Sequence, residues 1–366
     1  MSLDLIIPAP SATDEARRQI EICNACRYCE GFCAVFPAMT RQKSFADGDL
    51  TQLANLCHNC RGCYYACQYT APHEFALNIP AALAEVRVES WERLARPQAL
   101  ARLFQTHGVA MAGLLVVALA VFFWALGALR PVEGAGFYAH LAHNTLVAIF
   151  APAFVLPLLL IALSVRDYWR EVGGGRVRLA HLLRAFDSAA RMKNLSGGHG
   201  EGCNFEKGDR FSDRRRVFHQ LMMYGFLLCF ASTSSATLMH YLLGLEAPYA
   251  LISVPKLLGV PGGLMMAVGA VGLGWLKLRA DRSLGAARVW GGEMAFVLLL
   301  GAVALTGLGL YVATGSALVG PLLAVHLSTV MVLFLLMPFS KMVHGFYRLA
   351  ALVAEAGQPA PSSANE

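Results

Sequence analysis

Six long apolar segments follow the first hundred residues of this chain, and they constrain its fold more than any other feature. Each is long enough to cross about 30 Å of hydrocarbon, which takes roughly 20 helical residues. A backbone inside lipid must satisfy its own hydrogen bonds, so such segments fold as helices. The expected spans are 106–129, 140–165, 218–243, 257–276, 293–313 and 321–343. We therefore expect an all-α chain with a six-helix transmembrane bundle.

Basic residues gather in alternate loops. The loop 166–217 holds twelve Lys and Arg residues, and the loop after the fourth span adds four more, whereas the other loops carry almost none. Because cytoplasmic loops are the ones enriched in Lys and Arg, both termini are expected in the cytoplasm, with the spans in a bacterial inner membrane. No basic stripe interleaves with aromatic residues, so no nucleic acid partner is expected.

Two cysteine runs of identical spacing precede the spans. The runs are Cys23, Cys26, Cys29 and Cys33, and Cys57, Cys60, Cys63 and Cys67. Each reads C-x2-C-x2-C-x3-C, the ligand run of a bacterial [4Fe–4S] site. Structural zinc is the alternative, but zinc sites use four ligands, commonly in paired C-x2-C form. Eight cysteines in two runs of four fit zinc poorly and favour two [4Fe–4S] clusters.

The fourth cysteine of each run is expected to bind the cluster of the other run, as in two-cluster ferredoxins. The first cluster then takes Cys23, Cys26, Cys29 and Cys67, and the second takes Cys57, Cys60, Cys63 and Cys33. Pro37 lies four residues after Cys33, whereas the common bacterial run has Pro directly after its last cysteine. The linker between the runs has no strand pattern. The arrangement therefore resembles the α-helical ferredoxins of succinate dehydrogenase and heterodisulfide reductase subunits.

These features divide the chain into three parts. Residues 1–103 are expected to form a cytoplasmic helical ferredoxin domain, and 104–350 a membrane domain with the cytoplasmic loop 166–217. Residues 351–366 are expected to be a cytoplasmic tail. The stretch 75–103 has an amphipathic pattern with arginines near its end. We interpret it as a connector that leads onto the membrane surface.

Four histidines lie near the ends of two spans. His219 and His240 are 21 residues apart in the third span, and His326 and His344 are 18 apart in the sixth. At 1.5 Å per residue these separations are roughly 32 and 27 Å. The topology brings His219 and His344 to the cytoplasmic side, and His240 and His326 to the outer side. Because haem iron accepts axial imidazoles, we predict one or two b-type haems.

Other readings of these histidines stay open. All four could instead be packing or interfacial residues. The rival ligands are His107 on the inner side and His140 and His143 on the outer side. The histidine placement over residues 140–350 resembles the nitrate reductase gamma subunit, a five-helix membrane protein with two haems.

Three phrases carry a resemblance over nearly the whole chain. They are CNACRYCEGFCAVFPA (23–38), CHNCRGCYYACQYTAPHEFALNIP (57–80) and RRRVFHQLMMYGFLLCFAST (214–233). They resemble the tricarballylate utilization protein B family, also labelled citrate utilization protein B. The resemblance implies an FAD-dependent tricarballylate dehydrogenase as partner, whose reduced flavin the chain reoxidises. It also implies that the electrons pass to the membrane quinone pool.

The sequence has no recognisable dinucleotide fingerprint and no nucleophile elbow. We therefore expect an electron-transfer subunit of an oxidoreductase system rather than a self-contained enzyme. Two alternatives stay open. The chain could accept electrons from another donor, such as a dithiol or a different flavoprotein. It could also be a redox sensor or transporter in which the clusters only report the redox state.

Overall fold

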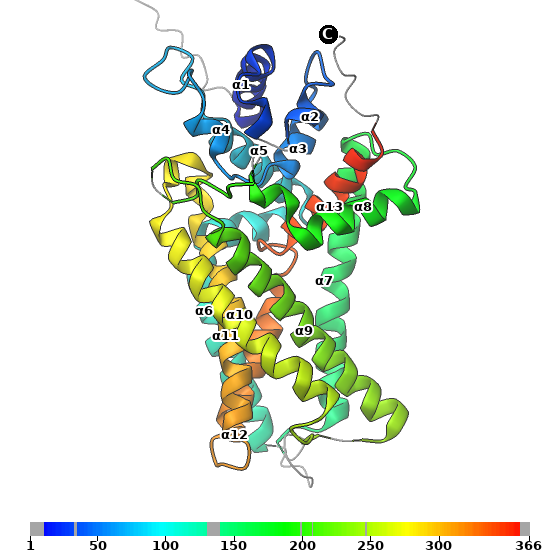
Figure 1. Ribbon diagram of the computed structural model, residues 1–366. Helices are drawn as coiled ribbons and strands as arrows, with labels where there is room; N and C mark the ends of the chain where they lie inside the picture. Colours follow the sequence, from blue (N-terminus) through cyan, green and yellow to red (C-terminus); the bar gives the residue numbers. More distant parts are fainter. Residues whose placement is uncertain are drawn as a thin grey trace, which may run out of the picture.

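The computed structural model describes residues 11–32, 35–129, 140–197, 200–206, 208–245 and 247–358. Within these ranges the regular elements are helices, and β-pairing is limited to two isolated bridges. Short helices gather at one end of the molecule and long helices extend away from them (Figure 1). The all-α prediction is confirmed.

The short helices and the turns between them carry the described cysteines of both runs and form what we call the cysteine layer. Its helices are α1 (Ala12–Cys26), η1 (Glu30–Phe32), α2 (Phe36–Met39), α3 (Asp47–Leu56), α4 (Gly62–Tyr65) and α5 (Ile79–Leu94). Ser11 caps α1, because its hydroxyl accepts a hydrogen bond from the backbone N–H of Asp14. Asn78 caps α5 in the same way through the N–H of Ala81. These caps fix where the two longest helices of the layer begin.

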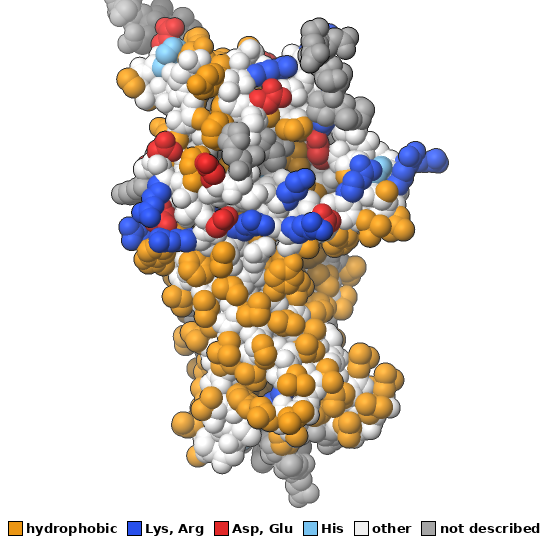
Figure 2. Space-filling view, viewed as in Figure 1, with side chains coloured by type: hydrophobic (Ala, Val, Ile, Leu, Met, Phe, Trp, Pro, Cys, Tyr) orange, Lys and Arg blue, Asp and Glu red, His pale blue; other side chains and the backbone are white. Residues whose placement is uncertain are grey.

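Among the described residues, six helices are long and apolar enough to cross a membrane, as the sequence predicts. They are α6 (Gln98–Leu129), α7 (His143–Glu171), α9 (Arg214–Leu243), α10 (Val254–Arg279), α11 (Trp290–Val312) and α12 (Val319–Leu336). Figure 2 shows hydrophobic side chains over these helices and a border of charged side chains next to the cysteine layer. The arrangement fits a multi-pass membrane protein.

Glycines bring α9 and α10 into backbone contact. A Cβ added at Gly225 would lie 2.6 Å from the backbone nitrogen of Met266, and one at Gly269 would lie 2.6 Å from that of Met222. Small residues of this kind allow close helix packing in membranes. This packing fixes the position of α9, the helix that carries His219.

The sixth span ends earlier than the sequence predicts. Helix α12 stops at Leu336, and after a short turn the chain starts α13 (Val343–Ala356). Pro338 accounts for the break, since proline has no N–H and its ring clashes with the carbonyl four residues earlier. The prediction of one helix over 321–343 is wrong at its end. His344 lies in the first turn of α13, not on the helix of His326.

Helix α13 packs against the cysteine layer rather than forming a loose tail. Gln52 on α3 donates a hydrogen bond to the Ala351 carbonyl at 2.9 Å, and Arg41 forms an ion pair with Glu355 at 2.5 Å. The boundary expected at residue 350 therefore falls inside a helix. The remaining described helices are α8 (Leu179–Arg191), η3 (Lys193–Ser196), η4 (Arg282–Leu284) and η5 (Ala287–Val289).

Helix α5 is a core helix of the cysteine layer. Trp91 is 5% exposed and donates to the Asn55 side chain at 2.9 Å. Arg87, also buried, donates to the Cys57 carbonyl at 2.8 Å. The interpretation of 75–103 as an amphipathic connector therefore fails over α5, whereas Gln98–Leu103 begin the long helix α6.

Candidate functional site

The two cysteine runs share one backbone feature. The residue after the second cysteine has left-handed φ in both, at 54° for Arg27 and 70° for Arg61. A residue with a side chain rarely adopts this conformation, and such strained positions cluster at functional sites. The preceding backbone differs, since Cys23 and Cys26 lie in α1 whereas Cys57 and Cys60 lie in a non-helical segment after α3.

The first set of thiols comes from both runs. Burial, and after it the neighbouring thiols of Cys29, Cys67 and Cys26, raise the pKa of the Cys23 thiol to about 12. The thiol of Cys67 also raises the pKa of Cys29, which burial shifts most, to about 11. Because thiolates this close repel one another, all of them can be deprotonated together only with a positively charged group between them. The structure therefore brings together the four cysteines predicted for the first cluster.

The second set lies deeper in the cysteine layer. Cys57, Cys60 and Cys63 line one small cavity, and Val35 lies on the same cavity wall. The Asn59 backbone N–H lies 3.4 Å from the Cys57 sulfur, a contact typical of thiolate ligands. Cys33, the predicted fourth ligand, lies outside the described residues.

The donor sets fit iron–sulfur clusters better than single ions. The nine cysteines that the structure describes are free thiols. In the described part of the chain, no three His, Cys, Asp or Glu side chains are close enough to hold one metal ion. A cluster of four irons and four sulfides spaces its thiolates further apart than one ion does. Ligation of two clusters by the eight cysteines of the two runs stays a prediction, and the proximity of the thiols in the first set supports it.

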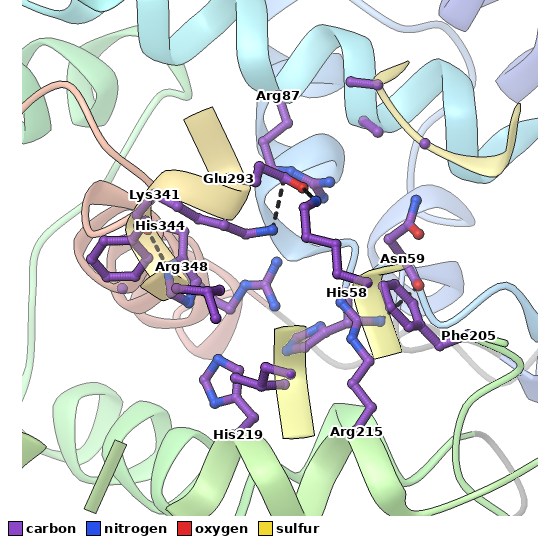
Figure 3. A pocket seen from close by; sticks show the side chains of 18 of the residues that line it. His58, Asn59, Arg87, Phe205, Arg215, His219, Glu293, Lys341, His344 and Arg348 are labelled. Carbon is purple, nitrogen blue, oxygen red and sulfur yellow. Dashed lines mark hydrogen bonds and ion pairs between the residues drawn. The ribbon is translucent and has the colours of Figure 1, made fainter. Parts of the chain in front are cut away.

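A cavity of about 510 Å³ lies between the second cysteine run and the ends of the long helices. Side chains from α5, α9, α11 and α13 converge on it (Figure 3). Its apolar wall includes Met222, Phe226 and Phe296. The volume lies within the range of ligand sites, about 300–1,000 Å³.

His219 and His344 both line this cavity. Their ring centres are 5.8 Å apart and their planes are at 88°. An iron held by two imidazoles would separate the ring centres by about 6 Å, since each metal–nitrogen bond is about 2 Å long and each ring centre lies about 1 Å beyond its nitrogen. His344 Nδ1 bonds the Lys341 carbonyl, so its Nε2 stays available as a ligand. His219 Nδ1 is buried without a hydrogen-bond partner in the described structure. These two residues fit a haem.

His58 is a third histidine on the cavity wall. Its Nδ1 lies 2.9 Å from the Leu56 carbonyl, so an N–H at Nδ1 leaves Nε2 as an acceptor. Burial, assisted by Arg348 and Arg215, lowers its pKa well below the usual range, which keeps the ring neutral. The sequence indicates only that His58 adjoins Cys57; its place in the cavity follows from the packing of α9 and α13.

An ion-paired group forms another part of the cavity wall. Glu293 on α11 pairs with Lys341 at 2.7 Å and with Lys277. Four arginines on the cavity wall lack such a carboxylate partner within the described residues, and each donates a hydrogen bond to a backbone carbonyl instead. They are Arg61, Arg87, Arg215 and Arg348.

The outer histidines are arranged differently from the inner pair. His240 lies against His143, one of the rival ligands, with ring centres 3.9 Å apart. That is too close for an iron between the two rings. His326 Nδ1 lies 3.0 Å from the Thr306 hydroxyl. The pairing of His240 with His326 stays a prediction. The inner rival, His107, is exposed at a kink in α6.

Comparison with known proteins places the chain in a family. Residues 16–92 match the model of the citrate utilization protein B Fer4-like domain. A Fer4-like domain followed by six apolar helices defines a membrane protein with an iron–sulfur domain. Residues 93–365 match the model of citrate utilization protein B, and the chain belongs to that family.

One relative shows how far the similarity extends. The chain is 46% identical over 357 residues to a protein of Escherichia coli named Citrate utilization protein B. The match covers 95% of this chain and 94% of the relative. No solved structure matches the chain.

Proposed function

We propose that this chain is a membrane-bound iron–sulfur electron-transfer protein. It reoxidises the reduced flavin of a partner tricarballylate dehydrogenase and passes the electrons to the quinone pool. The observation that carries the proposal is the order of the sites. The first thiol set is followed by the second thiol set, and then by the cavity at the ends of the membrane helices. Iron–sulfur clusters supply one-electron transfer when bound to such thiols.

The first thiol set is suited to receive a donor protein. Tyr28 lies between two cysteines of this set and is 73% exposed, and Cys26 is only half-buried. Helix α1 lies at the end of the molecule farthest from the long helices (Figure 1). Exposed aromatic side chains are enriched at protein interfaces. This surface is therefore where we place the contact with the flavoprotein.

The cavity is suited to a b-type haem between His219 and His344. Haem supplies a further one-electron centre when bound. The histidine placement supports one haem at this site, and a second remains part of the proposal through His240 and His326. We also infer that the cysteine layer and both termini are cytoplasmic, since the basic loops adjoin this layer.

The test is anaerobic reduction of the clusters in the purified full-length chain. The chain is mixed with the flavoprotein and tricarballylate, and cluster reduction is followed by electron paramagnetic resonance. Reduction that needs both components supports the proposal. A parallel arm uses citrate, because citrate stands in the relative's name. Reduction by a dithiol alone would instead support another donor, and clusters that no donor reduces would support a sensor or transporter.

A further inference from the structure

The two helices that carry the inner histidines share a second feature. Arg215 precedes His219 by four residues on α9, and Arg348 follows His344 by four residues on α13. Residues four apart lie on the same face of a helix. All four side chains line the cavity, and Figure 3 shows them converging from two helices. Each histidine is therefore accompanied by an arginine one helical turn away.

Both arginines also hold the loop of the second cysteine run. Arg215 donates to the Asn59 carbonyl at 2.8 Å, and Arg348 donates to the Cys57 carbonyl at 2.8 Å. A guanidinium has five N–H donors in a fixed plane, so one bond to the loop leaves others for a ligand. The Nε of Arg348 is buried and has no hydrogen-bond partner within the described residues.

The positive charge of these arginines lacks a matching carboxylate. Lys277 and Lys341 on the same cavity wall pair with Glu293. Arg215 and Arg348 have no such partner among the described residues. Both side chains are half-buried, and an accompanying anion stabilises a cation in such a site, so the cavity favours a negatively charged ligand.

We propose that Arg215 and Arg348 form a carboxylate-binding site that holds the propionate groups of the haem. Guanidinium groups bind carboxylates through two parallel hydrogen bonds, which fixes orientation as well as charge. The inference rests on the proposed haem at His219 and His344. A free polycarboxylate that entered the cavity would offer the same chemistry, and the experiment separates the two sources.

The test compares haem with haem dimethyl ester, which has no propionate charge. Full-length protein is produced in cells that cannot make haem, and each ligand is titrated by its absorption spectrum. Wild-type protein is expected to bind haem on the order of tenfold more tightly than the ester, since hydrogen bonds to charged groups are strong. Arg215→Gln and Arg348→Gln should each reduce that preference.

Arg214→Gln is the matched control. Arg214 neighbours Arg215 on α9 but is half exposed, pairs with Glu206 and does not line the cavity. This variant should keep the wild-type preference for haem over the ester. Iron and acid-labile sulfide are measured in every variant, because both tested arginines contact the second cysteine run.

Four results would overturn the proposal. Wild-type protein could bind haem and the ester equally, or bind neither. The variants could lose iron and sulfide while keeping the preference, which would assign the arginines to the cluster. Tricarballylate could bind the haem-free protein through these arginines and exclude haem, which would assign the site to a free acid. None of these readouts needs electron transfer, so failure of the proposed function is distinguishable from failure of this inference.

Discussion

Replacing Cys67 by alanine tests how the two thiol sets share their ligands. In the structure the thiol of Cys67 lies near those of Cys23 and Cys29, although it is the last cysteine of the second run. The loss should therefore remove the first cluster and spare the second. Two [4Fe–4S] clusters contain about eight irons, so iron content is expected to fall to about four per chain.

The assay is iron and sulfide content together with the electron paramagnetic resonance spectrum of the dithionite-reduced protein. Cys67→Ala should give the spectrum of Cys26→Ala and differ from that of Cys60→Ala. Cys229 on α9 belongs to neither set, so Cys229→Ala should keep both clusters. The reasoning is refuted if the spectrum of Cys67→Ala matches that of Cys60→Ala, because Cys67 would then bind the second cluster.

Three further substitutions test the cavity and the helix packing. Glu293→Ala leaves two half-buried lysines, Lys277 and Lys341, without their ion-pair partner and should destabilise the protein by about 1–3 kcal/mol, measured by thermal unfolding in detergent. Gly225→Val should cost at least about 1–3 kcal/mol by forcing α9 from α10, whereas Gly274→Val, with only an ordinary contact, should cost little. His344→Ala should remove the contribution of the cavity haem to the b-type absorption band, while His107→Ala should leave the band unchanged.

Each of these predictions has a contrary result. An unchanged unfolding temperature for Glu293→Ala would mean that water reaches the lysines and compensates for the lost pair. Equal effects of the two glycine substitutions would contradict the backbone contact between α9 and α10. A normal haem band in His344→Ala would assign the axial ligand to another residue.

Spacing and hydropathy predict most of this fold because both signals are local. The equal cysteine spacing is accompanied by a left-handed residue after the second cysteine of each run, Arg27 and Arg61. Apolar length predicts the number of spans. Hydropathy alone does not locate the end of the last span, since Phe339, Met342 and Val343 continue apolar residues beyond Pro338 and the helix break.

The cavity was less predictable because segments far apart in the sequence form it: the second cysteine run, α5, α9, α11 and α13. The topology predicts that His219 and His344 lie on the same side of the membrane, and their rings do lie close together. The helix break places His344 on α13 rather than on the last span. The contact of His240 with His143 depends on how α7 and α9 meet at their outer ends. The four-residue spacing between each arginine and histidine is visible in the sequence. That both arginines face one cavity is evident only from the structure, in which Arg215 and Arg348 bond the same loop of the second cysteine run.

The central claim is that this chain carries electrons from a flavoprotein to quinone. The most direct measurement reconstitutes the full-length chain in lipid nanodiscs with a short-chain quinone, the flavoprotein and tricarballylate under anaerobic conditions. Quinol is then counted against tricarballylate oxidised. The account predicts one quinol for each tricarballylate, and none when Cys26→Ala protein replaces the wild type. Quinol formation at the same rate without the chain, or with the Cys26→Ala protein, would contradict it.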